Sequence, residues 1–345
     1  MAKIAVLDIA ASKTGALSIL RDFYDQVKGH PDGNEWIFIT GAEGILEDCP
    51  ESRIRVFVRS DVKASSKARL WFDLVTGAGY IRSLGADVLF SLQNTLPRGK
   101  SAKKSVLYVH QPLGYQEIRN FSFWKKEERP LAVYQHLYSV LVNASVKKAD
   151  LTIVQTKWMR DAVLRKTGAD AERVVQILPE VGDISAYGKG QRFDPNFFFY
   201  PAGDILYKNH ELIRKAEEIL KDRGHTGFRI RLTRDEPMSR EEVYRTYFES
   251  TLLFPSYIET FGLPLAEASQ TGNPILVADT PFAREILEGY PNVRYFHPFR
   301  AEELARLMEE VMEGKILPAA PERESRDTEP ENSYGKIMEL VRHEA

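Results

Sequence analysis

Two carboxylates in the second half of the chain are spaced to bind one ligand, one from a loop and one from the helix that follows it. Glu259 comes after a short apolar run, 252–254, and Glu267 lies within a helical pattern that begins just past Gly262. In a parallel α/β sheet, a strand, glycine turn and helix start place free backbone N–H groups where anions bind. Carboxylates there suit the paired hydroxyls of a sugar or ribose, while amides and cations hold phosphates. The alternative is an ordinary helix with an acidic first turn.

A lysine near another helix start supplies the complementary charge. The apolar run 197–200 leads into a loop with Gly203, and Lys208 and Asn209 precede a helical pattern with one apolar face. A cation beside a helix N-terminus is unfavourable by about 0.3–1 kcal/mol, and an anion that bridges the two reverses this. The position therefore favours a bound phosphate, and a solvated lysine is the alternative.

The first half of the chain carries weaker signals. Gly15 and Ala16 stand between an apolar run and a helical pattern, where small residues let a ligand approach the backbone. His110 ends a strand candidate, 105–109, just before Pro112. A histidine there could point into a crevice, or it could be a structural histidine with its hydrogen bonds satisfied.

The elements that must position these residues are short β-branched runs alternating with longer amphipathic stretches, which is typical of βα units in a parallel sheet. The first half offers the strand candidates 4–7, 36–39, 54–58, 88–90, 105–109, 151–154 and 174–177. The second half offers 197–200, 228–232, 252–254, 274–277 and 293–296. Residues 179–196 are rich in Gly, Pro and Asp and follow neither period, so they predict a linker. We expect domains at 1–178 and 195–325, with a last helix, 333–345, that packs back on the first.

Composition sets the class of protein. The 345 residues are 43% hydrophobic and 28% charged, as in soluble globular proteins, and exclude a disordered or fibrous chain. Cys49 is the only cysteine, so no disulfide or cysteine metal cluster can form within the chain. The first residues predict a strand rather than a signal peptide, because charges interrupt the apolar run. No apolar run approaches the roughly 18 residues of a membrane span, and we expect a cytoplasmic protein.

The formal net charge of −2 hides an asymmetry between the two halves. Residues 1–178 carry 26 Lys and Arg against 19 Asp and Glu, or +7, and the remainder carries −9. A basic half could contact an anionic membrane surface or an acidic acceptor, or could simply be solvated. The cations are too dispersed among too few aromatics to indicate nucleic-acid binding.

The stretch FPSYIETFGLPLAEASQTGNPILVAD, 254–279, resembles the E-x7-E motif of retaining GT-B glycosyltransferases, especially glycosyltransferase family 4. That resemblance implies an α/β protein of two Rossmann-like domains whose parallel sheets face each other across a cleft. The first domain would take the acceptor and the second a nucleotide sugar. Glu259 would contact the donor sugar, and Glu267 would hold the ribose. Backbone amides near Phe261, Gly262 and Leu263 would meet the sugar or diphosphate.

The same resemblance gives roles to the other candidates. Lys208 would neutralise the leaving diphosphate, and Gly203 and Asn209 of the same loop would also contact the donor. The arginine that many members place shortly before this lysine is missing here. Gly15 and Ala16 resemble the first loop, which borders donor and acceptor. His110 would bond to the donor sugar or orient the acceptor.

Two further positions resemble the nucleoside side of the site. Thr233 follows the strand candidate 228–232, where the nucleobase is read. Arg284 would offset phosphate charge, and a surface pair with Glu285 is equally plausible.

The resemblance implies transfer of a sugar from a UDP- or GDP-sugar to a hydroxyl, with retention of anomeric configuration. The basic first half suits a glycan acceptor or a lipid-linked precursor of a surface polysaccharide, and we expect the enzyme to be peripheral at the inner membrane face. No D-x-D sequence or histidine cluster occurs, so we expect neither a metal nor a cofactor beyond the nucleotide-sugar substrate. The alternatives are a nucleotide-sugar epimerase or a sugar phosphorylase of the same fold, and a non-catalytic binding subunit.

Overall fold

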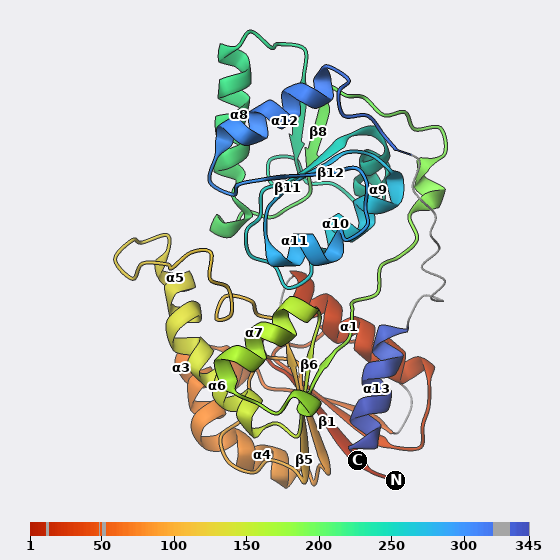
Figure 1. The fold of residues 1–345 in the computed structure, drawn as a ribbon. Coiled ribbons are helices and arrows are strands. Elements are labelled where there is room, and N and C mark those ends of the chain that lie inside the picture. The colour runs from red at the N-terminus through yellow and green to blue at the C-terminus, as the bar shows by residue number, and fades with distance from the viewer. Residues whose placement is uncertain (12–13, 48, 50–52, 320–331, 345) are drawn as a thin grey trace. The chain divides into compact units, whose positions relative to one another are not determined.

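The chain divides into two compact units, each built on one parallel sheet (Figure 1). The computed structural model describes residues 1–11, 14–47, 49, 53–319 and 332–344. Unit 1 comprises Met1–Tyr115, Pro130–Pro179 and Asn332–Ala345, and unit 2 comprises Gln116–Arg129 and Glu180–Glu331.

The sheet of unit 1 has seven parallel strands in the order β3-β2-β1-β4-β5-β6-β7. Their bounds are β1 Lys3–Asp8, β2 Glu35–Thr40, β3 Ile54–Val58, β4 Val88–Ser91, β5 Lys104–Val109, β6 Leu151–Val154 and β7 Val174–Gln176. The order of the strands reverses between β1 and β4, and ligands of open α/β sheets bind outside the carboxyl ends of the strands at such a switch point.

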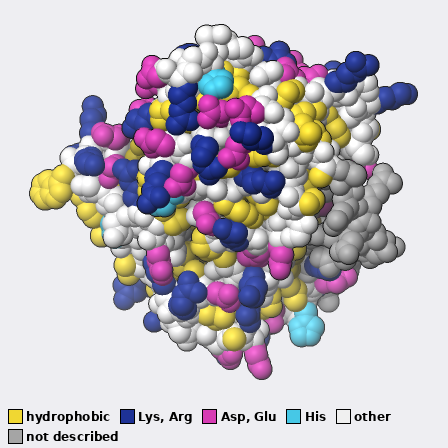
Figure 2. Space-filling view, turned by 45° about the horizontal axis from the view of Figure 1, so that its top comes forward, with side chains coloured by type: hydrophobic (Ala, Val, Ile, Leu, Met, Phe, Trp, Pro, Cys, Tyr) yellow, Lys and Arg dark blue, Asp and Glu magenta, His cyan; other side chains and the backbone are white. Residues whose placement is uncertain are grey.

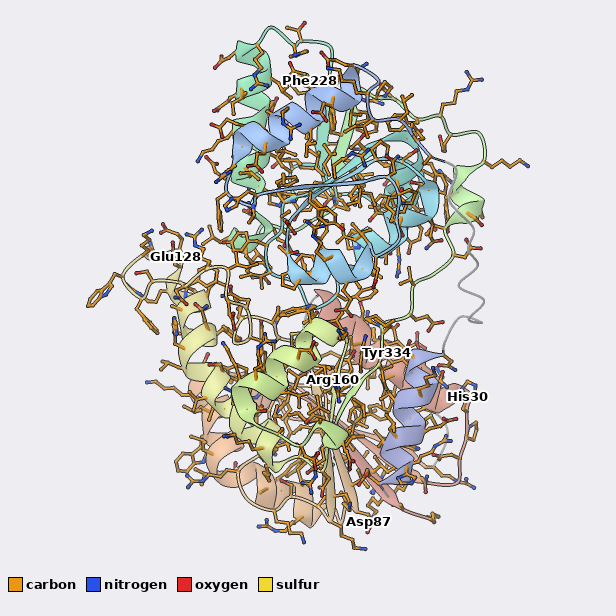
Figure 3. All side chains as sticks on the ribbon, viewed as in Figure 1. His30, Asp87, Glu128, Arg160, Phe228 and Tyr334 are labelled. Carbon is orange, nitrogen blue, oxygen red and sulfur yellow. The ribbon has the colours of Figure 1, made fainter. Side chains whose placement is uncertain are left out.

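Helices cover this sheet and bury two apolar clusters. The helical segments are α1 Thr14–Gly29, α2 Ser60–Lys63, α3 Ser66–Trp71, the π-helical turn η1 Phe72–Thr76, α4 Gly77–Ser83, α5 Arg129–Ala132, the π-helical turn η2 Val133–Tyr138, α6 Ser139–Lys148, α7 Lys157–Thr167, the 3₁₀ turn η3 Ala171–Arg173 and α13 Ser333–His343. Helix α13 returns from the end of the chain to contact α1, and the Tyr334 hydroxyl donates to Asp22 Oδ2 at 3.2 Å (Figure 3). Its apolar side chains, such as Ile337 and Val341, complete a cluster that includes Trp36.

Unit 2 has five parallel strands in the order β12-β11-β10-β8-β9. The strands are β8 Phe197–Tyr200, β9 Arg229–Leu232, β10 Thr251–Phe254, β11 Ile275–Ala278 and β12 Val293–Phe296. The helical segments are the 3₁₀ turns η4 Ser185–Gly188, η5 Leu206–Lys208 and η6 Ser269–Thr271, with α8 His210–Asp222, α9 Arg240–Glu249, α10 Leu263–Ala268, α11 Pro281–Ile286 and α12 Ala301–Met312. Here the switch point lies between β8 and β10, the strands that lead to Lys208 and Glu259.

Every strand expected from the sequence is present, with ends that shift by at most one residue. The prediction of an unbroken first domain at 1–178 was wrong for residues 116–129, which belong to unit 2. In that segment the Arg119 guanidinium donates to the Tyr257 hydroxyl at 3.4 Å, and it pairs with Glu128 at 2.6 Å (Figure 3). Such contacts join residues far apart in the chain, so a reading of local periodicity cannot find them.

Candidate functional site

An ion pair between Lys208 and Glu259 lies at the switch point of the second sheet. Lys208 ends the turn η5 after β8, and Glu259 stands in the loop after β10. The Lys208 ammonium contacts Glu259 Oε1, and the two side chains are 20% and 16% exposed. Ser256 Oγ donates to the same carboxylate oxygen at 2.8 Å. The structure therefore brings together Lys208 and Glu259, two of the three residues with expected catalytic roles, of which His110 is the third.

Three tyrosines, of which Tyr200 and Tyr257 are buried, hold the two loops that carry this pair. The Tyr200 hydroxyl donates to the Lys208 carbonyl at 2.9 Å, and the Tyr207 carbonyl accepts from the Tyr257 backbone N–H at 3.2 Å. Burial, together with the nearby charge of Glu259, raises the pKa of both Tyr200 and Tyr207 well above the usual value. Both hydroxyls are therefore neutral at physiological pH, and the bonds of Tyr200 and Tyr207 fix the backbone of the two loops around the pair.

Asn209 joins three loops of unit 2. Its backbone is left-handed, with φ 60°, and it caps the start of α8. Its side-chain amide donates to the Pro298 carbonyl at 2.7 Å and to the Pro255 carbonyl at 3.3 Å. The amide that was expected to meet the donor is thus engaged within the protein. Gly203, in the same loop, has open space where a Cβ would stand, and its carbonyl accepts from His210 Nε2 at 3.0 Å.

The turn before α10 depends on a glycine. Gly262 has φ +89°, a left-handed conformation that strains other residues, and a Cβ there would stand 3.3 Å from Leu265. Phe261 before it is buried, and Leu263 after it begins the helix. Helix α10 covers only Leu263–Ala268 and continues to Gly272 as the 3₁₀ turn η6. The dipole at this turn is therefore weaker than an α-helix that reached Gly272 would give.

Glu267 lies in a different environment from Glu259. Its side chain is 6% exposed, its Oε2 accepts from the Tyr247 hydroxyl at 3.0 Å, and its Oε1 lies 3.8 Å from the Arg240 guanidinium. Burial raises the pKa of this carboxyl. Glu267 lies in the second turn of α10, whereas the sequence pattern places it in the first turn. Its contact with a ribose stays a prediction.

A pocket of about 480 Å³ opens beside this site in unit 2. It is lined by the loop after β8, the first turns of α8 and α12, and the segment that precedes α5, including Asp204, Asn209, Arg234 and Arg119. Arg234 forms an ion pair with Asp204 at 3.0 Å. Neither Glu259 nor Glu267 is among the lining residues. The pocket thus borders the loop that carries Lys208, through Leu206 and Asn209.

Two other predicted residues of unit 2 have partners within the protein. Thr233 directly follows β9, and its hydroxyl donates to the Ala202 carbonyl at 3.4 Å. Arg284 makes two bonds of 2.8 Å to Asp279 and stacks 3.7 Å from the ring centroid of Tyr295. The acid that pairs with Arg284 is thus Asp279 and not Glu285, which the sequence offered as the alternative partner, because successive residues of a helix do not face each other. A phosphate would have to compete with Asp279 for this guanidinium.

In unit 1 the geometry of His110 is that of a structural histidine. Its Nε2 donates to the Leu92 carbonyl at 2.8 Å, and its backbone N–H donates to Asn94 Oδ1 at 2.7 Å. Desolvation lowers the pKa of the ring, so the imidazole is neutral at physiological pH. Gly15 and Ala16 lie in the first turn of α1, and a Cβ at Gly15 would meet nothing within 4 Å. The contact of Gly15 and Ala16 with a ligand stays a prediction.

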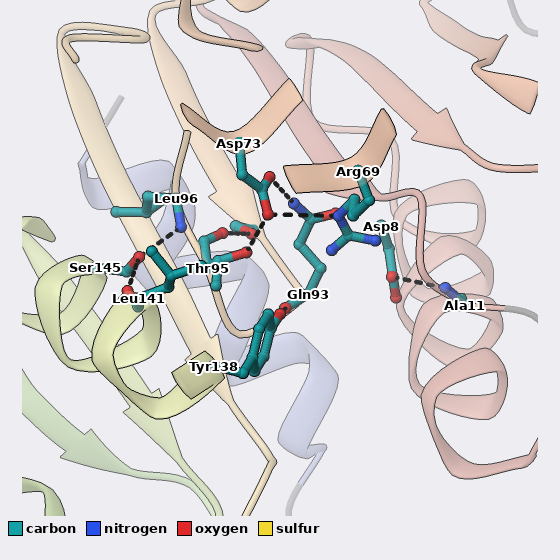
Figure 4. A network of polar contacts seen from close by, with 11 residues as sticks. Asp8, Ala11, Arg69, Asp73, Gln93, Thr95, Leu96, Tyr138, Leu141 and Ser145 are labelled. Carbon is teal, nitrogen blue, oxygen red and sulfur yellow. Dashed lines mark hydrogen bonds and ion pairs between the residues drawn. The ribbon is translucent and has the colours of Figure 1, made fainter. Parts of the chain in front are cut away.

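A buried polar network stands at the switch point of the first sheet (Figure 4). The carboxylate of Asp73 accepts from Gln93 Nε2 and Thr95 Oγ1, each at 3.2 Å, and pairs with Arg69 at 3.5 Å. Asp8, at the end of β1, is 1% exposed, and its Oδ2 has no partner among the described residues. Burial raises the pKa of Asp8 to about 6. Neither acid was singled out from the sequence.

Sequence reasoning also missed two residues that touch the paired loops. Ser256 is fully buried and donates to Glu259, and the only signal for it was its place three residues before that glutamate. Arg119 reaches Tyr257 from a segment without any local signal. Among the described residues, no group of three or more His, Cys, Asp or Glu is arranged to hold a metal ion. None of the described helices combines the length and hydropathy that a membrane crossing requires.

Comparisons with known proteins agree with this architecture. Residues 236–328 match the family model of Glycosyl transferases group 1. The chain is 23% identical over 203 residues to the O-antigen chain mannosyltransferase RfbU of Salmonella typhimurium, covering 52% of this chain and 55% of that one. It is 40% identical over 80 residues to a D-inositol 3-phosphate glycosyltransferase of a Nocardioides species, covering 23% and 17%. The chain thus spans about half, or less, of these two relatives.

Solved structures resemble the whole chain. The crystal structure of Anabaena HepE in complex with UDP and glucose aligns with a TM-score of 0.62 at 14% identity, over 99% of this chain and 100% of that one. WaaG, a glycosyltransferase involved in lipopolysaccharide biosynthesis, aligns with a TM-score of 0.63 at 14% identity, over 98% and 99%. The expected GT-B fold is confirmed, and unit 2 carries the region that matches Glycosyl transferases group 1.

Proposed function

We propose that the chain transfers a sugar from a nucleotide diphosphate sugar to a hydroxyl acceptor, with retention of configuration and without a metal. The observation that carries this proposal is the pair of Lys208 and Glu259 at the switch point of the second sheet. This is the edge of an α/β sheet at which ligands bind. A family match over the same region and a fold shared with a UDP-bound protein support it.

The chemistry follows from what each charge can hold. Lys208 moves from Glu259 to the diphosphate and neutralises the charge that develops as the bond from the sugar to the phosphate oxygen breaks. Glu259 then accepts hydrogen bonds from hydroxyls of the donor sugar. The acceptor oxygen bonds to the anomeric carbon, and its proton goes to the departing phosphate oxygen, so no separate base is needed.

Because no arginine stands shortly before Lys208, the site has fewer cations with which to neutralise the diphosphate. Arg234 and Arg284 are paired with Asp204 and Asp279, respectively. Stabilisation of the leaving group therefore rests on Lys208 and on backbone amides, such as those that follow Gly262.

For the acceptor we propose a glycan or a lipid-linked precursor of a surface polysaccharide. Two of the similar proteins are named for O-antigen and lipopolysaccharide synthesis. The enzyme would work on the cytoplasmic side and touch the membrane peripherally, since such acceptors are held there.

A ligand panel tests the proposal. UDP, GDP, ADP and their sugars are added in thermal-shift measurements with Mg²⁺ or with a chelator, and a ligand at about 100 times its Kd should add about 2.7 kcal/mol of stability. The stabilising donor is then incubated with candidate acceptors, and NMR of the product reports the anomeric configuration.

Each outcome bears on one part of the proposal. Transfer that persists in the chelator with a retained anomer supports it, and loss of transfer in the chelator refutes metal independence. Epimerised or phosphorolysed sugar would identify another enzyme of this fold, and tight binding without turnover of any donor would indicate a binding subunit.

A further inference from the structure

The pocket of about 480 Å³ in unit 2 has a wall that is made by the first turns of two helices. Helices α8 and α12 pack side by side, and both begin at this pocket (Figure 1). The first N–H groups of a helix have no partner within the helix, and neither N-cap residue here supplies a side-chain hydrogen bond. The wall therefore offers hydrogen-bond donors to a ligand. We call this site the α8/α12 pocket.

A buried histidine in the same wall lacks one hydrogen bond. His210 is the first residue of α8, lines the pocket and is 3% exposed. Its Nε2 donates to the Gly203 carbonyl at 3.0 Å, and burial lowers the pKa of the ring, so the neutral ring carries its proton on Nε2. Nδ1 is then an acceptor, and it has no partner among the described residues. Buried polar atoms are normally hydrogen-bonded, and a hydroxyl group in the pocket would supply the donor that Nδ1 lacks.

The charged groups of the pocket are paired. Three cations line it, and each of them has an acidic partner. The pairs are Arg234–Asp204 at 3.0 Å, Lys215–Glu211 at 3.7 Å and Arg119–Glu128 at 2.6 Å. An anionic ligand would have to displace a carboxylate to gain a cation, whereas a hydroxyl can accept from the cation and donate to the carboxylate while the pair stays together. The charges therefore favour a neutral ligand that is rich in hydroxyls.

Apolar side chains are exposed beside these polar groups. Phe299, Ile205 and Leu206 line the pocket and are 45%, 42% and 39% exposed. The centroid of the Phe299 ring lies 5.2 Å from that of Tyr257 and 5.8 Å from that of His297, in edge-on contacts that hold the ring in place. On the face of the molecule that Figure 2 shows, apolar side chains are also exposed among interspersed Lys, Arg, Asp and Glu. A sugar ring suits such a surface, because it has C–H groups on its faces and hydroxyls around its edge.

We propose that the α8/α12 pocket binds a neutral sugar unit. A hydroxyl of the sugar donates to His210 Nδ1, other hydroxyls accept from the N–H groups at the helix starts, and a C–H face of the ring packs on Phe299. The use of this site for a sugar of the acceptor glycan rests on the proposed function, whereas the binding of a sugar does not.

The α8/α12 pocket is additional to the expected donor site. Of the residues expected to bind the donor, all of which the structure describes, only Asn209 is among the lining residues. Its side-chain amide donates to the carbonyls of Pro298 and Pro255, so it is engaged within the protein. A sugar in this pocket therefore need not compete with the donor.

Sugar titrations followed by saturation-transfer NMR test the proposal on the full chain. The neutral probes are glucose, galactose, mannose and N-acetylglucosamine, and glucuronate is the anionic probe. At least one neutral sugar should bind with a Kd in the millimolar range, and glucuronate should bind more weakly than glucose. A protein that binds none of the neutral sugars, or that prefers glucuronate, would overturn the proposal.

Two variants remove the proposed contacts one at a time. His210→Gln can still donate to the Gly203 carbonyl but loses the acceptor at Nδ1, so sugar binding should weaken about 3-fold to 10-fold. Phe299→Ala loses the ring and should weaken sugar binding about fivefold or more. The unfolding midpoint shows whether each variant is folded, and the exposed position of Phe299 keeps the test available if the variant of buried His210 is not.

Each variant has a matched control in unit 2. Phe123→Ala is the control for Phe299→Ala, because Phe123 is 40% exposed and is not among the lining residues. His225→Gln is the control for His210→Gln, because His225 pairs with Glu309 and does not line the pocket either. Both controls should bind the sugar as the wild type does. Binding at the wild-type level in either folded variant of the pocket would overturn the proposal.

A further variant separates this site from the donor site. Glu259→Gln should leave the binding of the sugar unchanged. Binding that Glu259→Gln abolishes and Phe299→Ala retains would place the sugar at the donor site and overturn the proposal. A protein that binds the sugar through His210 and Phe299 but binds no nucleotide would support the α8/α12 pocket and contradict the proposed function, so the two failures are distinguishable.

Discussion

Neutralising Glu259 should separate donor binding from catalysis. In the structure the Lys208 ammonium is held by Glu259, so a nucleotide diphosphate has to displace that carboxylate before it gains the cation. Glu259→Gln removes the competing charge while keeping a side chain of the same shape. We expect this variant to bind UDP at least as tightly as the wild type, by up to about tenfold, and to transfer sugar poorly.

The size of the effect follows from the burial of the pair. With side chains only 20% and 16% exposed, the ion pair is screened less than one at the surface. A hydrogen bond to a charged group contributes about 1.5–3 kcal/mol. Lys208→Met should therefore weaken UDP binding by about 10-fold to 100-fold. A double-mutant cycle in urea should give a coupling of about 2 kcal/mol between the two residues.

Isothermal titration with UDP measures the binding, and urea unfolding measures the coupling. Lys221→Met is the matched control, because Lys221 pairs with Glu217 on the same unit and is 60% exposed. That variant should change stability by no more than about 0.5 kcal/mol and leave UDP binding as it was. Weaker UDP binding in Glu259→Gln than in Lys208→Met would refute the reasoning.

The remaining predictions concern stability. Tyr247→Phe removes the hydroxyl that donates to buried Glu267, so it should cost about 1–3 kcal/mol in urea unfolding, and an unchanged midpoint would contradict the burial of that carboxylate. Asp8 has its folded pKa raised to about 6 from 3.8, so the folded state binds the proton more tightly and loses stability as pH rises from about 4 to about 6. Asp8→Asn should lack that loss, which is of the order of 3 kcal/mol, and parallel pH profiles of the two proteins would count against it. Asn209→Gly keeps the left-handed backbone while losing the amide, and Asn209→Ala loses both, so thermal unfolding should show alanine as the worse replacement by about 1 kcal/mol.

The fold was accessible from the sequence because buried parallel strands are short and almost wholly apolar. Phe197–Tyr200 and Leu151–Val154 are buried at every position, and the sequence predicted both strands with the bounds that the structure has. Turn chemistry was accessible for a similar reason. Gly262 adopts the left-handed conformation that glycine favours, and it marks the start of α10.

The sequence predicted the contacts between side chains only in part. Lys208 and Glu259 were placed in one site from the helix starts and the family motif, but their direct contact depends on how two loops pack. The burial of Glu267 beneath Tyr247 and the capture of Arg284 by Asp279 also depend on tertiary packing. Local periodicity carries no information about such contacts.

His110 shows a further limit. A histidine at the end of a strand has the same sequence signal whether it faces a ligand or a carbonyl. In the structure, His110 Nε2 donates to the Leu92 carbonyl, which lies at the end of a neighbouring strand.

The most direct test of the central claim is a crystal structure with a bound nucleotide diphosphate sugar. Our account predicts that Lys208 Nζ turns from Glu259 to a phosphate oxygen and that the Glu259 carboxylate accepts from a hydroxyl of the sugar. A donor bound elsewhere, with the ion pair intact, would contradict it.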